Sequence, residues 1–220
     1  MSGHPYEQGF DLKLWPERLE MPLRWKEPKM IFVNSMSDLF HEKVPDEYIA
    51  RVFEVMIKAD HHIFQVLTKR SERMMQWTTD HFRQVNLRLN GHPLLPKHIW
   101  LGVSVENQKY TSRIHHLQKV PSQVRFLSVE PLLGPITLRG SFLRGIHWVI
   151  VGGESGHKAR PMNPEWVATI QRNCREHSVP FFFKQWGAFD ESGRKVGKKA
   201  AGRILDGKTY DEMPVVEASI

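Results

Sequence analysis

The stretch Ile99–Asn107 (IWLGVSVEN) is a short apolar run that ends on a carboxylate and an amide. Five further runs of this kind are Ile31–Asp38 (IFVNSMSD), Ile63–Arg70 (IFQVLTKR), Val124–Glu130 (VRFLSVE), Trp148–Ser155 (WVIVGGES) and Pro180–Trp186 (PFFFKQW). Runs rich in Val, Ile, Phe and Trp that are too short for helices are typical of buried parallel strands joined by crossover helices. The sequence therefore predicts an α/β fold, a partial or open TIM-like (β/α) barrel with about six parallel strands.

The segments between these runs show helical spacing and capping. Pro45–Lys58 opens with a proline and two carboxylates, which suit a helix N-terminus. Ser71 is expected to cap a helix that runs to about Leu89, and a further helical segment follows Asn107. Asn163 is expected to cap a helix that buries Cys174, and residues 136–147 to form only a short, irregular crossover.

The length of 220 residues falls within the range of one α/β domain. We expect an N-terminal arm over 1–30, a barrel core over 31–187 and a C-terminal extension over 188–220. No apolar stretch approaches the roughly 18 to 20 residues needed to cross a bilayer, and the N-terminus lacks the apolar core of a secretory signal. These features predict a cytoplasmic protein with no membrane partner; its oligomeric state is left open.

The formal net charge of +7 points to an anionic partner, with nucleic acid the first candidate. The densest basic cluster is Arg194–Arg203 (RKVGKKAAGR), which either contacts phosphate or forms a solvated loop. Trp15 and Trp25 are candidate exposed aromatic residues for stacking on bases.

Three carboxylates, Glu106, Glu130 and Glu154, follow three of the runs at a constant spacing of 24 residues. Together with Lys184 they are the candidate catalytic residues. Charges next to buried strands are costly unless they are paired, and Lys69, Arg70 and Lys184 are the available partners from other strands. The pattern predicts either a salt-bridge layer that closes the barrel or a ligand site at the strand ends.

Other chemistry-bearing features are weaker. The glycines of Val151–Gly156 (VGGESG) let a backbone approach a ligand closely, but the segment is neither a Walker loop nor a full dinucleotide-binding motif. The paired histidines His61–His62 and His115–His116 lack metal-ligand spacing, so we expect solvent-facing side chains and no metal site.

The chain from Gly3 onward resembles a known family through long segments. They include Ile31–Phe40 (IFVNSMSDLF), Gln65–Arg70 (QVLTKR), Trp100–Asn107 (WLGVSVEN), Phe126–Pro135 (FLSVEPLLGP), Val149–Gly156 (VIVGGESG) and Phe181–Gly187 (FFFKQWG). The family is a phage- and mobile-element-associated group of unknown function, marked by an N-terminal three-cysteine motif and similar to radical S-adenosylmethionine (SAM) enzymes. The resemblance implies a further strand and clustered cysteines upstream, which would hold a [4Fe–4S] cluster.

The chain carries a single cysteine, Cys174, which cannot replace three cluster ligands. We therefore expect no cofactor in the chain as given, with SAM and [4Fe–4S] possible only if the upstream segment is present; whether SAM still binds is left open. A truncated form, or a descendant that has lost the chemistry, is the expectation, with an open sheet edge in the truncated case.

The resemblance to SAM-binding barrels suggests roles for the remaining strand-end residues. The candidates for cofactor binding are Asn34, Ser35, Asp38, Ser104, Gly152 and Gly153. The candidates for substrate binding are Gln65, Lys69, Arg70, Asn107, Ser128, Gln185 and Trp186. Whether the protein is an enzyme is left open. The alternatives are a non-catalytic nucleic-acid-binding module of a mobile element and a cluster-free barrel hydrolase or lyase.

Overall fold

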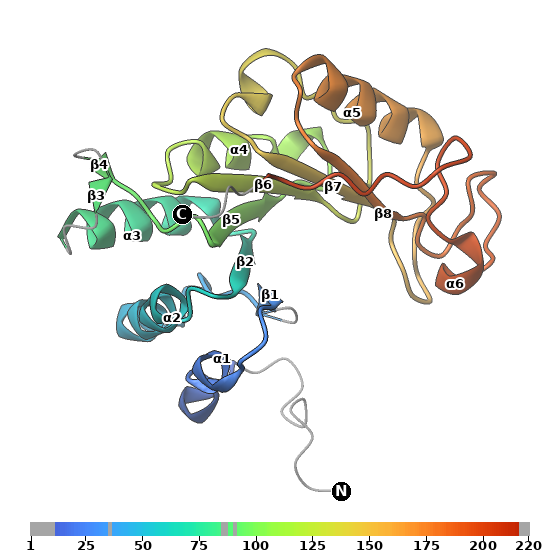
Figure 1. The fold of residues 1–220 in the computed structure, drawn as a ribbon. Helices are drawn as coiled ribbons and strands as arrows, with labels where there is room; N and C mark the ends of the chain where they lie inside the picture. The colour runs from blue at the N-terminus through green and yellow to red at the C-terminus, as the bar shows by residue number, and fades with distance from the viewer. Residues whose placement is uncertain (1–11, 35–36, 85–87, 90–91, 216–220) are drawn as a thin grey trace, which may run out of the picture.

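The computed structural model describes residues 12–34, 37–84, 88–89 and 92–215. Its centre is a six-stranded sheet in the order β1-β2-β5-β6-β7-β8, in which every neighbouring pair is parallel. The strands are β1 (Met30–Val33), β2 (Ile63–Thr68), β5 (Ile99–Ser104), β6 (Val124–Val129), β7 (Trp148–Gly152) and β8 (Phe181–Gln185). The sheet curves into an open half-barrel (Figure 1), which confirms the predicted architecture.

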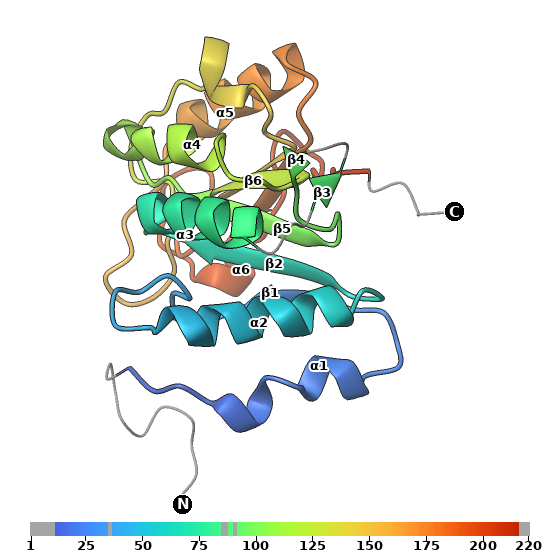
Figure 2. The ribbon, with the colours of Figure 1, turned by 90° about the vertical axis from the view of Figure 1, so that its left-hand side faces the viewer.

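Helices α2 (Asp46–Lys58), α3 (Ser71–Gln84), α4 (Ser112–Leu117) and α5 (Pro164–Glu176) follow β1, β2, β5 and β7. They lie one after another along one side of the sheet (Figure 2). Each buries an apolar stripe against the strands, as α2 does with four side chains: Ile49, Val52, Phe53 and Met56. Between β6 and β7 the crossover is only the short 3₁₀ helix η3 (Gly140–Leu143), as the sequence predicted.

Two helical segments differ from the predictions. Helix α3 is described as far as Gln84, and Arg88–Leu89, which were expected at its end, instead form β3, which pairs antiparallel with β4 (His92–Pro93). The helical segment after Asn107 begins as a 3₁₀ helix, η2 (Gln108–Tyr110), before α4 starts at Ser112. The Asn107 side chain accepts the Lys109 N–H at 3.0 Å and so fixes this tighter turn.

The two faces of the sheet are packed differently, since successive strand residues alternate between them. The face under the helices contributes the main core, with residues such as Val66, Leu101 and Val149. The opposite face carries a smaller cluster of buried residues: Trp100, Val124, Phe126 and Trp148. Gly102 makes room for this cluster, because a Cβ there would overlap the Phe126 ring.

The N-terminal arm contains η1 (Pro16–Arg18) and α1 (Met21–Arg24), and it lies beside α2. His62 joins the arm to the sheet: its Nδ1 accepts the Lys29 N–H at 3.1 Å and its Nε2 lies 2.9 Å from the Pro22 carbonyl. His62 is 1% exposed, so its predicted solvent-facing position is wrong, whereas neighbouring His61 is exposed. The physical reason is that the arm covers it and satisfies both ring nitrogens.

The C-terminal extension covers the β8 side of the sheet. Phe183 donates its N–H to the Tyr210 carbonyl at 3.0 Å, and the Trp148 indole donates to the Glu212 carbonyl at 2.8 Å. The short helix α6 (Lys198–Ala201) lies at this end of the molecule, away from α2 (Figure 1). In the described part of the chain, every helix is too short or too polar to cross a bilayer.

Candidate functional site

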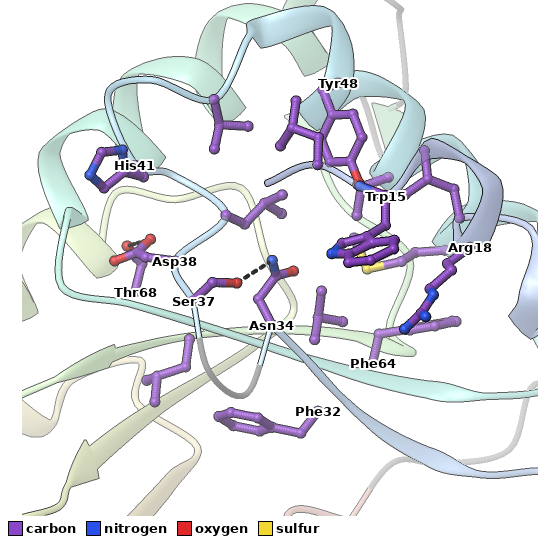
Figure 3. Close-up of a pocket in the computed structure, with 18 of the residues that line it drawn as sticks. Trp15, Arg18, Phe32, Asn34, Ser37, Asp38, His41, Tyr48, Phe64 and Thr68 are labelled. Atoms are coloured by element: carbon purple, nitrogen blue, oxygen red, sulfur yellow. Dashed lines mark hydrogen bonds between the residues drawn. The ribbon is translucent and has the colours of Figure 1, made fainter. Parts of the chain in front are cut away.

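The ends of β1, β2 and β5 open into one cavity of about 1020 Å³ (Figure 3). Five residues predicted for the site line it: Asn34, Asp38, Lys69, Arg70 and Ser104. The structure therefore brings together residues that lie as far apart in the sequence as 34 and 104, because parallel strands end at one edge.

The rest of the wall comes from segments that were not predicted to belong to this site. Trp15 and Arg18 of the arm and Tyr48 of α2 line the cavity, and the Tyr48 hydroxyl lies 3.4 Å from the Trp15 backbone nitrogen. No strand-end pattern marks these residues in the sequence. Their position depends on how the arm packs against α2.

Asp38 fixes the loop after β1 to the end of β2. Its carboxylate accepts the Phe40 N–H at 3.0 Å, the Thr68 hydroxyl at 2.7 Å and the Lys69 N–H at 3.1 Å. It also forms an ion pair with Arg70 at 2.9 Å. Four donors use most of the acceptor capacity of a carboxylate, so Asp38 is a positioning residue of the cavity wall.

Asn34 lies beside Asp38 on the same loop, with a positive φ of 60°. Its side-chain amide donates to the Ser37 hydroxyl at 2.9 Å (Figure 3). Asparagine tolerates this left-handed conformation better than most residues. The turn leaves the Asn34 amide exposed at the cavity, where it can contact a ligand.

Glu106 follows β5 and is 6% exposed. It forms ion pairs with Lys69 Nζ at 2.6 Å and with Arg113 at 2.9 Å, and Arg113 also donates to the Ser104 carbonyl at 2.8 Å. Burial alone would raise the pKa of Glu106, but Lys69 and Arg113 outweigh it and hold the pKa below its ordinary value. The predicted pairing with Lys69 is confirmed, whereas Arg113 was not anticipated.

Glu130 forms a second cluster, at the ends of β6, β7 and β8. Lys184 Nζ lies 2.8 Å from one carboxylate oxygen, and Gln185 Nε2 donates to the other at 3.1 Å. Gly152 provides the space, because a Cβ there would lie 2.9 Å from Glu130 Oε1. The predicted pairing of Lys184 with a carboxylate from another strand is confirmed.

Glu154 is held by a partner from its own loop. Arg160 contacts the carboxylate through its backbone N–H, Nε and Nη2, each at 2.8 Å. The Arg160 guanidinium hydrogen bonds lower the pKa of Glu154 to about 2. A cation from another strand was expected here, and the structure instead shows a local one.

The two loops after β7 and β8 touch backbone to backbone. A Cβ on Gly153 would overlap the Trp186 carbonyl, and Gly153 donates its N–H to the Gln185 carbonyl at 2.9 Å. The second glycine of the VGGESG segment therefore permits this close contact within the protein. Binding of a ligand at Gly152 and Gly153 stays a prediction.

The other predicted residues lie in separate places. Gln65 donates to the Met30 sulfur at 2.8 Å, and Ser128 is buried in register with Ser104. Trp186 is buried and donates its indole N–H to the Ile204 carbonyl at 2.7 Å. Asn107 caps η2, and Ser35 lies outside the described residues.

A [4Fe–4S] cluster would need cysteine thiolates from this chain as its ligands. Cys174 lies on α5 and is fully buried, and burial raises the pKa of its thiol to about 12. The described ranges contain no group of three or more His, Cys, Asp or Glu side chains that could hold a metal ion. A cluster needs several thiolates, so the residues present do not fit it.

Comparison with known proteins adds one finding. No curated protein and no solved structure matches the chain. A family model described as "Protein of unknown function (DUF5131)" matches residues 2–214, which is nearly the whole sequence. The chain therefore belongs to this family, the DUF5131 proteins of unknown function.

Proposed function

We propose that the protein is a radical-SAM-like half-barrel of phage and mobile-element type, whose strand-end cavity binds an adenosine-containing ligand such as SAM. The observation that supports this most is the convergence of strand-end residues Asn34, Asp38, Lys69, Arg70 and Ser104 on one cavity. Parallel α/β folds bind small molecules at this edge.

The chemistry of the lining suits the parts of such a ligand. Trp15 is half-buried and offers an aromatic surface on which a purine can stack. The Asn34 amide can donate to and accept from a base or ribose. Because the chain's own residues do not fit a cluster, the proposal concerns binding, and no reaction step is derived.

Equilibrium dialysis with SAM and with S-adenosylhomocysteine tests the proposal. We expect saturable binding of both, weakened about tenfold by Trp15→Ala because stacking on an aromatic ring is worth about 1 to 3 kcal/mol per base. Trp166→Ala on α5 is the matched control, since Trp166 is also half-buried but does not line the cavity. Equal binding by the two variants, or no binding at millimolar ligand, would refute the proposal.

A second candidate function, binding of nucleic acid, is supported by the C-terminal extension. Four basic side chains of its Arg194–Arg203 cluster are exposed: Arg194, Lys195, Lys198 and Lys199. A gel shift at two salt concentrations tests this, because phosphate contacts weaken steeply with salt. We expect Lys198→Glu with Lys199→Glu to abolish a low-salt shift, and a shift that these changes leave intact would argue against this surface.

A further inference from the structure

The cavity has a second part, of which the proposed ligand uses only the Trp15 ring. In Figure 3, Asp38 and Thr68 lie on one side of Asn34, and Trp15, Arg18 and Tyr48 lie on the other. This second side is bounded by the arm and α2.

The wall on this second side is largely apolar. Val52 and Val55 of α2, Leu14 and Leu19 of the arm and Ile31 of β1 line the cavity. Val55, Leu14, Leu19 and Ile31 are only half-buried, so apolar surface remains uncovered within a concave site. Covering such surface yields roughly 25 cal/mol per Å², which favours an apolar occupant.

The charges around this wall are of one sign. Lys13 Nζ lies 4.0 Å and Arg18 Cζ 4.3 Å from the centroid of the Trp15 ring. Both side chains and Lys43 line the cavity, and within the described ranges none of the three forms an ion pair. The carboxylate in the lining, Asp38, is already held by Arg70 and three other donors.

Lys13 and Arg18 place two positive charges beside one indole. An anion bound at this ring would be attracted by both charges and could accept charge-assisted hydrogen bonds from them. The neighbouring apolar wall would then cover whatever is attached to that anion. The site thus combines an electrostatic and an apolar requirement.

We propose that the arm side of the cavity binds an amphipathic anion, with an aliphatic or aromatic tail along α2 and a carboxylate or phosphate head at Lys13 and Arg18. A neutral apolar molecule would leave the two cations uncompensated, and a cationic amphiphile would be repelled. A volume of about 1020 Å³ is at the upper end of small-molecule pockets, which leaves space for a tail beside a second ligand.

The experiment uses cis-parinaric acid as the probe, because its excitation overlaps tryptophan emission and both Trp15 and Trp25 line the cavity. Laurate, dodecyl phosphate and dodecyltrimethylammonium, all below their micelle concentrations, are then competed against it. We expect both anions to displace the probe and the cation of equal chain length not to. The ratio between laurate and dodecyl phosphate distinguishes a carboxylate head from a phosphate head.

Arg18→Gln and Val55→Trp separate the two parts of the site. Arg18→Gln is expected to weaken the anions about tenfold, and Val55→Trp, which fills the apolar wall, to weaken them at least as much. Arg24→Gln is the control, since Arg24 is an exposed arginine of the same arm that does not line the cavity. Circular dichroism checks folding, and the surface change Arg18→Gln carries the test if Val55→Trp does not fold.

Equal competition by the anions and the cation, or equal probe affinity of Arg18→Gln and Arg24→Gln, would overturn the proposal. Dialysis with SAM on the same preparations keeps the two proposals apart. Probe binding without SAM binding refutes the adenosine-ligand proposal alone, and SAM binding without probe binding refutes the amphipathic-anion proposal alone.

Discussion

The carboxylates at the strand ends form ion pairs with cations that lie at very different separations from them in the sequence. Glu106 pairs with Lys69 from the neighbouring strand β2, whereas Glu154 pairs with Arg160 only six residues away. Both pairs keep the carboxylate ionised, but the two ion pairs differ in solvent exposure. The Glu106 carboxylate is buried, whereas the Arg160 side chain that pairs with Glu154 is largely solvent-accessible. Glu106 is therefore part of the sheet's internal structure, and Glu154 stabilises its own loop.

Replacing Arg160 by Gln should return the pKa of Glu154 from about 2 toward its ordinary value. Because the pKa of Glu154 is lower in the folded than in the unfolded protein, the ionised carboxylate stabilises the fold at pH values above about 4.5. This stabilisation is lost as the pH falls from about 4.5 toward 2. The free energy of unfolding of the variant should therefore fall less steeply over that window than that of the wild type. Carbon-detected NMR titration and urea unfolding at several pH values measure both effects.

The control for this change is Arg172→Gln, because the partner of Arg172 is the exposed Glu165. This variant should leave the pKa of Glu154 and the acid slope unchanged. An unaltered Glu154 titration in Arg160→Gln would contradict the assigned ion pair.

Cys174 should resist alkylation in the native protein. The thiol is buried and its pKa is raised to about 12, so almost no thiolate is present at pH 8. Mass spectrometry after iodoacetamide treatment should show labelling only when urea unfolds the chain. Rapid labelling of the folded protein would show that α5 does not pack as described.

At the scale of elements, the β7 and β8 loops are held together by main-chain contact. Gly153 and Gly187 allow the crossing: Ala188 donates its N–H to the Glu154 carbonyl at 2.8 Å, and a Cβ on either glycine would overlap backbone atoms. This crossing places Glu154, in the loop after β7, near Gln185 at the end of β8. A glycine pair after a strand therefore has a structural explanation here that does not require a ligand.

Gly153→Ala should lower the free energy of unfolding by about 3 kcal/mol, because backbone atoms of another loop must move to admit the methyl group. Gly134→Ala is the matched control, since its Cβ would lie an ordinary 3.4 Å from the Asn107 Cβ. Urea denaturation compares the two. Similar stabilities would mean that the loops do not approach as closely as the structure shows.

At the scale of the whole molecule, each strand pairs with the next one to enter the sheet, and the helices cover one face continuously. The arm is joined to the sheet through His62, and the C-terminal extension through Phe183 and Trp148. These contacts couple both ends of the chain to the same core.

Such coupling predicts that the chain unfolds as one cooperative unit, which also tests the expectation of a single domain. Tryptophan fluorescence and far-ultraviolet circular dichroism should give coincident urea transitions. An early fluorescence transition that is lost in a Trp15→Phe, Trp25→Phe variant would instead show that the arm unfolds separately.

Much of the fold was predictable because its signals are local. The run at 99–107 predicts a strand from its own composition, and Asn163 predicts the start of α5, where its side chain accepts the Glu165 N–H at 2.8 Å. The prediction that α3 reaches about Leu89 was wrong, because Arg88–Leu89 pair with β4. The burial of His62 was missed for a different reason, since the arm that covers it lies far away in sequence.

The sequence by itself determined the strands, their parallel arrangement and the edge at which the polar residues gather, because hydrophobic period and run length are properties of neighbouring residues. It also identified Lys69 and Lys184 as partners for strand-end carboxylates, since an unpaired charge beside a buried strand is costly. Only the tertiary structure decided which residues enclose a cavity. Trp15, Arg18 and Tyr48 line it because the arm packs across α2, and long-range packing of this kind leaves no periodic signal in the chain.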